Sequence, residues 1–365
     1  MKHWALATGV ALALTAVVTT PALAEGIEGF GAAAGSLGES RGTAGGIGAV
    51  TGSTASTGNT GNTGNTGNTG NTDAARSTGG TAPKAVSNAT AAPISGAVYF
   101  RYGGSGVEVL TYRGGRSSGG PTAGAGAFAG QFAVAPDGRR IAWIDDKNRL
   151  RVTSANGPRM GTVIAKNAAY GGPCLTPAWS ADGKRIAYPV KGTGEAMTVA
   201  VIGPDGRGRF NAGKTSGPCH LTWSADGRTL AGYAGDTDGV HLLDTRRRTS
   251  SRAPGVRLAN HVESLSPDGR RVVVNAIGAN APGGDGSWPL SFTPSIYDTR
   301  TGAKAAIPVK GRLLGARYLR DGRLAVRVKG TSVNTIVVLS RSGKEIQRMA
   351  EPAGAKNLGL LWLLG

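Results

Sequence analysis

The chain has 365 residues, of which 61 are glycine, 39% are hydrophobic and only 17% are charged, and its 41 Lys and Arg residues against 22 Asp and Glu give a net charge of +19. The glycine excess, the 5% aromatic content and the scarcity of Glu/Lys-rich helical periodicity argue against a helical bundle and indicate turn-rich or unfolded sequence. Two cysteines are too few for a disulfide-dense small domain or a four-cysteine zinc site.

Residues 1–24 have the pattern of a secretory signal peptide. Lys2-His3 precedes an apolar stretch over residues 4–18, and Ala22-Leu23-Ala24 supplies the small-residue pattern of a cleavage site. The stretch is too short for a stable membrane span, and an uncleaved amino-terminal anchor is the alternative. We therefore expect cleavage after Ala24 and secretion into the periplasm or the extracellular space, with no transmembrane segment after cleavage.

Residues 25–93 are a low-complexity segment dominated by Gly, Ala, Ser and Thr, with Gly-Asn-Thr triplets that run to Thr72. Side chains this small bury too little apolar area to offset the entropy of ordering the backbone. The sequence predicts a disordered linker. The linker either tethers the folded domain to a surface such as the cell wall, or is neutral low-complexity sequence.

From residue 94 onward one unit recurs five times: an apolar strand, an Asp-Gly turn, a basic residue and a second apolar strand. The copies are residues 132–143, 178–188, 221–233, 262–274 and 316–326. Their turn aspartates are Asp137, Asp182, Asp226, Asp268 and Asp321, at spacings of 45, 44, 42 and 53 residues. Asp-Gly permits the positive φ that a two-residue hairpin turn demands, and strands covered on both faces are apolar throughout.

Weaker signals place a second hairpin in each unit, with strands expected at residues 150–153, 198–203, 240–244, 295–298 and 335–339. Two hairpins make a four-stranded blade, and blades arranged radially close into a β-propeller. The 272 residues of 94–365 give about 45 residues for each of six blades. Residues 97–102 and 107–112 resemble later strands of a blade, whereas residues 360–364 resemble a first strand. The sequence thus predicts an all-β, six-bladed propeller whose last strand pairs with its first hairpin.

The turn motifs carry a resemblance to a known family. Ser266-Pro267-Asp268-Gly269, Ser224-Ala225-Asp226-Gly227 and Ser180-Ala181-Asp182-Gly183 resemble the WD40-like (PD40) repeats of TolB-like six-bladed propellers. The resemblance implies the propeller fold, and it leaves function open because such blades occur in periplasmic scaffolds, peptidase gating domains and carbohydrate-active proteins. The chain departs from these relatives in having low-complexity sequence where TolB has a folded α/β domain, and in lacking a Gly-x-Ser-x-Gly hydrolase elbow.

Three histidines follow the signal peptide: His220, His241 and His261. No two of them have the short spacing of a local metal pair, so we predict no metal site, no cofactor and no catalytic residue from motifs. His220 and His261 sit at comparable ends of successive blades. Convergence at the channel mouth and ordinary packing or hydrogen bonding are the two interpretations.

The two cysteines occupy the same tripeptide in consecutive units, Gly172-Pro173-Cys174 and Gly217-Pro218-Cys219. An exported chain meets oxidising conditions, so a disulfide between neighbouring blades is expected. Two buried thiols that merely pack together are the alternative.

Basic residues follow the turn glycines, and propeller topology places these turns together with the turns between the third and fourth strands on one face. The candidate basic face comprises Arg139, Arg140, Lys184, Arg185, Arg228, Arg246, Arg247, Arg248, Arg270, Arg271 and Arg323. Such a surface suits an anionic cell-wall polymer or an envelope protein. Export and the lack of stacking aromatics beside these turns argue against a dedicated nucleic-acid site, and charge that serves solubility alone is the alternative.

The longest insertion, residues 278–289, lies on the opposite face and carries Asp285 and Trp288, a candidate ligand loop. Trp288 either stacks on a sugar or peptide at the surface or folds back onto its own blade. We predict an exported, monomeric, non-catalytic binding or scaffold propeller of the cell envelope. The alternative is a glycan- or peptide-acting hydrolase or lyase with its site at the channel mouth.

Overall fold

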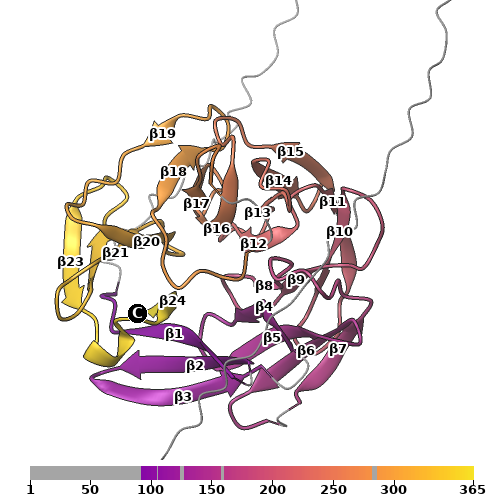
Figure 1. Ribbon diagram of the computed structural model, residues 1–365, viewed down its shortest axis with the longest axis horizontal. Helices are drawn as coiled ribbons and strands as arrows, with labels where there is room; N and C mark the ends of the chain where they lie inside the picture. The colour runs from indigo at the N-terminus through magenta and orange to yellow at the C-terminus, as the bar shows by residue number, and fades with distance from the viewer. Residues whose placement is uncertain (1–91, 105, 124–126, 158–159, 282–285) are drawn as a thin grey trace, which may run out of the picture. The chain divides into compact units, whose positions relative to one another are not determined.

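The computed structural model describes residues 92–104, 106–123, 127–157, 160–281 and 286–365. These residues form six four-stranded antiparallel sheets arranged as blades around a central axis (Figure 1). The region along this axis is called here the axial channel, as in other β-propellers. The predicted all-β, six-bladed propeller is therefore confirmed. The predicted signal peptide and most of the predicted linker lie outside the described residues. The described part of the chain includes no helix with the length and hydropathy of a membrane span.

The blades are numbered in chain order, and the strands of each blade are given from the inner strand outward. Blade 1 contains β24 (Gly359–Leu364), β1 (Gly96–Gly103), β2 (Gly106–Arg113) and β3 (Arg116–Thr122). Blade 2 contains β4 (Ala127–Val134), β5 (Arg140–Asp145), β6 (Arg149–Ser154) and β7 (Thr162–Lys166). Blade 3 contains β8 (Ala178–Trp179), β9 (Ile186–Pro189), β10 (Met197–Ile202) and β11 (Phe210–Thr215).

The remaining blades repeat this order. Blade 4 contains β12 (Cys219–Trp223), β13 (Thr229–Tyr233), β14 (Val240–Asp244) and β15 (Thr249–Arg252). Blade 5 contains β16 (Ala259–Leu265), β17 (Arg271–Ala276), β18 (Ser295–Asp298) and β19 (Lys304–Ala305). Blade 6 contains β20 (Leu313–Tyr318), β21 (Leu324–Val328), β22 (Thr335–Leu339) and β23 (Glu345–Ala350), and a short 3₁₀ helix (Ala353–Ala355) leads from it to β24.

The ring closes through blade 1, as the sequence predicts. β24, the last strand of the chain, pairs antiparallel with β1, from Gly96 opposite Leu364 to Phe100 opposite Gly359. This pairing covers the inner edge of β1 and completes the fourth strand of blade 1. Leu361 and Leu364 are buried in the cluster that fills the space between blades 1 and 2.

The turns between first and second strands differ from the prediction in one respect. The glycine of each turn has a positive φ, for example 72° at Gly138 and 71° at Gly269, whereas the aspartates do not. A two-residue type I′ turn needs positive φ at both central residues, so the predicted two-residue hairpin was wrong. The N–H of Gly138 instead donates to the carbonyl of Ala135. The Asp137 carboxylate accepts the N–H of Arg139 at 2.9 Å, so it caps the turn backbone.

Two sets of turns lie together on one face, called here the turn face. It is defined by the turns at residues 135–140, 180–185, 224–229, 266–271 and 319–323 and by the turns between third and fourth strands. In blade 4 the N–H and hydroxyl of Thr245 donate to the carbonyl of Arg228 at 2.9 and 3.0 Å. In blade 5 the N–H of Thr299 donates to the carbonyl of Arg270 at 2.9 Å. These bonds fix one set of turns against the other.

Candidate functional site: a basic turn face and a closed channel

Four basic side chains project from the turn face into solvent. These turn-tip cations directly follow the turn glycines of blades 2 to 5, and all four are exposed: Arg139, Lys184, Arg228 and Arg270. The backbone N–H of each one donates to the turn aspartate at 2.9–3.1 Å. The backbone beneath each cation is therefore held in place, while the charged end is exposed; that of Arg228 lies 3.9 Å from Asp226.

The basic residue that comes second after the glycine has a different role in blades 2 and 3. The guanidinium of Arg140 lies 4.7 Å from the ring centre of Trp179, which belongs to the inner strand of the next blade. Arg185 lies 5.0 Å from the ring centre of Trp223 in the same way. These cation–π contacts join successive blades, so the two arginines belong to the packing between blades as well as to the basic face.

Between blades 5 and 6 the corresponding residues, Arg271 and Tyr318, are joined by a hydrogen bond. Burial raises the pKa of Tyr318, and a hydrogen bond from Arg271 in the preceding blade partly offsets that rise. Where the second basic residue is replaced by Thr229, the equivalent position of the next blade is Leu265 and not an aromatic residue. The basic residue and the aromatic ring therefore occur together at the junctions between blades 2 and 3, 3 and 4, and 5 and 6. Both are absent at the junction between blades 4 and 5.

The remaining predicted basic residues also lie at the turn face. Arg246, Arg247 and Arg248 are exposed in the turn between β14 and β15. Arg323 is half-buried, and its Nε donates to the carboxylate of its own turn aspartate, Asp321, at 2.8 Å. The structure therefore distinguishes exposed cations from half-buried ones such as Arg323, and among the exposed cations Arg228 and Arg247 lie 3.9 and 4.0 Å from Asp226 and Asp244.

The axial channel contains the predicted histidines in direct contact. Nδ1 of His220 lies 2.7 Å from Nδ1 of His261, and both side chains are completely buried. His220 adopts a φ of 46° where the pairing of β12 with β13 is interrupted by a register shift between Cys219 and Thr222. A positive φ is uncommon for a residue with a side chain, and such strained positions cluster at functional sites. His241, in β14, is half-buried and does not take part.

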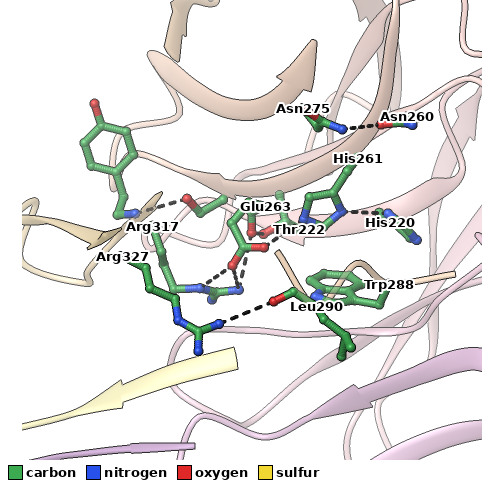
Figure 2. Close-up of polar contacts among 12 residues, drawn as sticks. His220, Thr222, Asn260, His261, Glu263, Asn275, Trp288, Leu290, Arg317 and Arg327 are labelled. Carbon is green, nitrogen blue, oxygen red and sulfur yellow. Dashed lines mark hydrogen bonds and ion pairs between the residues drawn. The ribbon is translucent and has the colours of Figure 1, made fainter. Parts of the chain in front are cut away.

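A chain of polar contacts continues from the histidine pair across the channel (Figure 2). Nε2 of His261 lies 2.8 Å from Oε2 of Glu263, and Nε of Arg317 donates to Oε1 of Glu263 at 2.7 Å. The Arg317 guanidinium in turn lies 4.3 Å from the ring centre of Trp362 in β24. The inner strands of blades 4, 5, 6 and 1 are therefore linked through one buried network, whose Glu263 and Arg317 charges cancel.

Hydrogen bonding assigns the protons of this network. Glu263 accepts a hydrogen bond from His261 when Nε2 of His261 carries a proton, which leaves Nδ1 of an uncharged His261 as an acceptor. His220 must then donate from Nδ1, so its Nε2 has a lone pair and no proton. Among the described residues this buried Nε2 has no hydrogen-bond partner of normal geometry.

Burial keeps both imidazoles uncharged. It lowers the pKa of His220 well below the usual range, His261 lowers it further, and a backbone group of Gly286 opposes the shift. The pKa of His261 is also lowered by burial, against the opposing effect of Glu263. Burial by itself would raise the pKa of Glu263, but Arg317 and His261 outweigh it and keep the carboxylate charged.

Trp288 closes the channel mouth above the histidines. Its side chain is only 8% exposed, and its ring centre lies 4.9 Å from those of both His220 and His261. The hydroxyl of Tyr102 donates to the Trp288 carbonyl at 2.8 Å and so ties the loop to blade 1. Trp288 is therefore neither a surface residue nor packed on its own blade alone, while Asp285 lies outside the described residues.

The space directly beside the buried network is small, although a cavity of about 330 Å³ adjoins it and is lined by Leu290, Leu314 and Arg327 among others. Beside the network are two cavities of about 20 and 40 Å³, which Arg317 lines in both cases. Spaces of this size hold one or two water molecules and exclude a sugar or a peptide. The described residues contain no cluster of three or more His, Cys, Asp or Glu side chains that could hold a metal ion.

A second buried ion pair lies between blade 6 and the closing strand. Nε and Nη2 of Arg327 donate to Oε2 of Glu351 at 3.0 and 2.9 Å, and the hydroxyl of Tyr99 donates to Oε1 at 3.0 Å. Arg327 also donates to the carbonyls of Ala355 and Leu358 at 2.9 and 2.7 Å. One guanidinium thus anchors the segment that leads into β24.

Cys174 and Cys219 are joined in the structure, with their sulfur atoms 1.97 Å apart. Cys174 lies in the loop before β8 and Cys219 begins β12, so the bond connects blades 3 and 4 directly below the histidine pair. The N–H of His220 donates to the carbonyl of Cys174 at 2.8 Å, which holds the strained His220 backbone against the disulfide segment.

We expect protein produced under oxidising conditions to contain this bond and no free thiol. Non-reduced protein should therefore resist alkylation, and mass spectrometry should find it lighter by two hydrogens. For a loop of 45 residues the chain-entropy relation gives up to about 4 kcal/mol of stabilisation. The Cys174→Ala/Cys219→Ala variant should lose part of that amount in urea unfolding. Two alkylated cysteines in non-reduced protein would contradict the expectation.

Glu263 and Arg317 were not among the residues predicted from the sequence. A signal was present, because both residues interrupt inner strands that are apolar or uncharged in the other copies. A charged residue in a buried strand requires an opposite charge nearby. In successive repeats Glu263 lies five residues, and Arg317 four residues, before the turn aspartate, so the two opposite charges belong to neighbouring inner strands.

No protein-family model matches the chain, and no curated protein matches it. Similar solved structures include TolB from Acinetobacter baumannii, at 14% identity and a TM-score of 0.48, over 73% of this chain and 67% of that one. They also include a chain of a nidogen/laminin complex, at 11% identity and a TM-score of 0.46, over 74% of this chain and 97% of that one. An oligogalacturonate lyase in complex with manganese matches at 11% identity and a TM-score of 0.41, over 66% of this chain and 70% of that one. The sheet order found here makes the chain a six-bladed β-propeller, and TolB propellers are among the structures that it resembles in fold.

Proposed function

We propose that this protein is an exported, non-catalytic binding propeller of the cell envelope that holds an anionic polymer, or an acidic protein partner, against its turn face. The observation that carries the proposal is the exposure of the four turn-tip cations on one face. Four successive blades present one such cation each from a fixed backbone, so a long anion can meet several of them at once. Multiple weak ionic contacts of this kind add up to useful affinity.

Turn aspartates reduce this positive field without removing it. Although burial acts to raise the pKa of Asp268, hydrogen bonds from Ser266 and from the Arg270 backbone lower it overall, so the carboxylate stays ionised. Each of the first turns in blades 2 to 5 therefore holds one negative charge against its basic residues. Arg246, Arg247 and Arg248 add three exposed positive charges beside the turn of blade 4.

The competing proposal is an enzyme that acts on a glycan or peptide at the channel mouth. The convergence of His220, His261 and Glu263 favours it, because imidazole and carboxylate groups are general acids and bases. Against it stand the complete burial of the histidines beneath Trp288 and the small cavities beside them. A substrate has no access to these groups in the closed channel.

The test reverses the four turn-tip cations to Glu and measures retention of the protein on polyphosphate and heparin resins. Arg140, Arg185 and Arg271 stay unchanged, since their contacts join the blades. Exposed ion pairs contribute about 0.2–1 kcal/mol each, so losing four of them and adding repulsion should weaken binding at least about tenfold. Retention of the parent should fall with salt, because the Debye length shrinks to about 3 Å at 1 M.

A matched control carries the same change of charge on the opposite face. It reverses four exposed residues in the loops between second and third strands and between blades: Lys147, Lys191, Arg257 and Lys329. This control and Trp288→Ala should both keep the parent's retention. If the control loses retention as much as the turn-face variant does, net charge alone explains binding and the turn face is not the site. If Trp288→Ala abolishes retention, the channel-mouth proposal gains support instead.

A further inference from the structure

The buried imidazole pair is enclosed by charged, titratable and aromatic groups from every element packed against it. From β16 come Glu263 and His261 itself, and from β20 comes Arg317, which neutralises Glu263. The Tyr233 ring of β13 lies 5.2 Å from that of His220. The loop between β17 and β18 contributes the uncharged rings of Trp288 and Phe292. The disulfide below the pair does not titrate.

The pair has a defined capacity for protons. One proton can add to the free lone pair on Nε2 of His220, which leaves the bond from Nδ1–H of His220 to Nδ1 of His261 intact. Transfer of the shared proton then moves the charge to His261, beside the Glu263 carboxylate. A second proton would place two N–H groups against each other across the 2.7 Å contact, so the doubly charged pair must separate.

A charged imidazole needs water, and the surroundings determine where water can enter. Strands β12, β13 and β16 and the disulfide are fixed by ladder bonds and by a covalent bond. The other two rings packed on the pair, those of Trp288 and Phe292, come from the long loop between β17 and β18, and of these two only the Trp288 ring contacts both imidazoles. We propose that His220 and His261 form a proton-binding site whose occupation displaces Trp288 and opens the mouth of the axial channel.

Because proton binding and the opening of the channel mouth are linked equilibria, the difference in histidine pKa between the closed and open forms determines how far acidification shifts the protein toward the open form. With Trp288 in place, burial holds the pKa of both histidines below the usual range, whereas hydrated histidines titrate near pH 6.5. Protons therefore bind more strongly to the open form, and acidification favours it. One histidine can shift the ratio of open to closed forms by about tenfold for each pH unit below 6.5, or roughly 100-fold at pH 4.5.

The experiment follows Trp288 by ¹⁹F NMR in protein labelled with 5-fluorotryptophan, between pH 7.5 and 4.5. Trp288→Phe assigns the resonance, and the resonances of Trp143, Trp179, Trp223 and Trp362 report on the rest of the propeller. We expect the Trp288 resonance to move to a solvent-exposed position on acidification while the other four stay in place. The imidazole ¹³Cε1 shifts of the same sample should show His220 and His261 taking up protons over the same pH range.

Variants separate this site from other histidines. His241→Gln, the matched control, should leave the transition unchanged, whereas His220→Gln/His261→Gln should abolish it while keeping the buried resonance of Trp288 at pH 7.5. If the double variant does not keep that resonance, the proposal is judged from the parent protein alone, by whether His220 and His261 take up protons over the same pH range in which the Trp288 resonance moves. A static Trp288 resonance, a transition that Trp288 shares with Trp143, Trp179, Trp223 and Trp362, or histidines that titrate without a change at Trp288 would each overturn the proposal.

Discussion

Deleting the last nine residues, 357–365, should abolish cooperative folding of the propeller. The deletion removes all of β24, the inner strand of blade 1, and leaves β1 unpaired on its channel side. It also removes Leu358, Leu361 and Leu364, each less than 10% exposed. At 1.5–3 kcal/mol for each buried leucine the loss is about 5–9 kcal/mol, comparable to the whole stability of an ordinary domain.

Thermal unfolding followed by circular dichroism checks this expectation. Removing Gly365 alone, an exposed residue beyond the strand, is the control and should leave the melting temperature within a degree or two of the parent. A truncated protein that melts as a single transition at the parent's temperature would show that β24 does not close the ring.

Arg327→Met should be among the most destabilising single substitutions in the propeller. It leaves the Glu351 carboxylate, whose side chain is fully buried, without its ion-pair partner. It also removes the hydrogen bonds that Arg327 donates to the carbonyls of Ala355 and Leu358, just before β24. Breaking one side of a buried ion pair typically costs about 3–5 kcal/mol, because the remaining charge stays out of water.

Urea unfolding measures the loss in free energy of unfolding for Arg327→Met and for Arg348→Met, a substitution in an exposed ion pair. Arg348 pairs with Glu345 at 2.8 Å, but both side chains are about half exposed, 55% and 44%. Arg348→Met should therefore cost less than about 1 kcal/mol. If the two substitutions cost the same, the Arg327–Glu351 pair does not anchor the closing segment.

Local turn chemistry made the fold predictable. Each Asp-Gly turn marks where one strand ends and the next begins, and the regular spacing gives the blade and its number. The closing role of residues 360–364 could be predicted because the first hairpin of the repeat region lacks an inner strand, and an unmatched inner strand occurs at the end of the chain. The turn type was wrong because Asp-Gly also suits longer turns, in which the glycine alone has positive φ.

The candidate site was harder to predict from the sequence, because its contacts join residues of different blades. Glu263 and Arg317 are 54 residues apart, and their pairing depends on the rotation of one blade against the next. The same holds for Arg140, whose position beside Trp179 distinguishes it from its exposed neighbour Arg139. Trp288 was placed on the correct loop, but the sequence contains no sign that its ring packs against two hydrogen-bonded histidines.

Acetylation footprinting of lysines in the presence of a polyphosphate chain tests the central proposal most directly. Lys184, Lys304 and Lys344 belong to the turn face, whereas Lys147, Lys191 and Lys329 lie in exposed loops of the opposite face. All six are exposed, so mass spectrometry can compare their modification rates with and without the polymer. Binding at the turn face predicts slower acetylation of the first three and no change in the others. Protection of the second three with no change in the first would contradict the proposal.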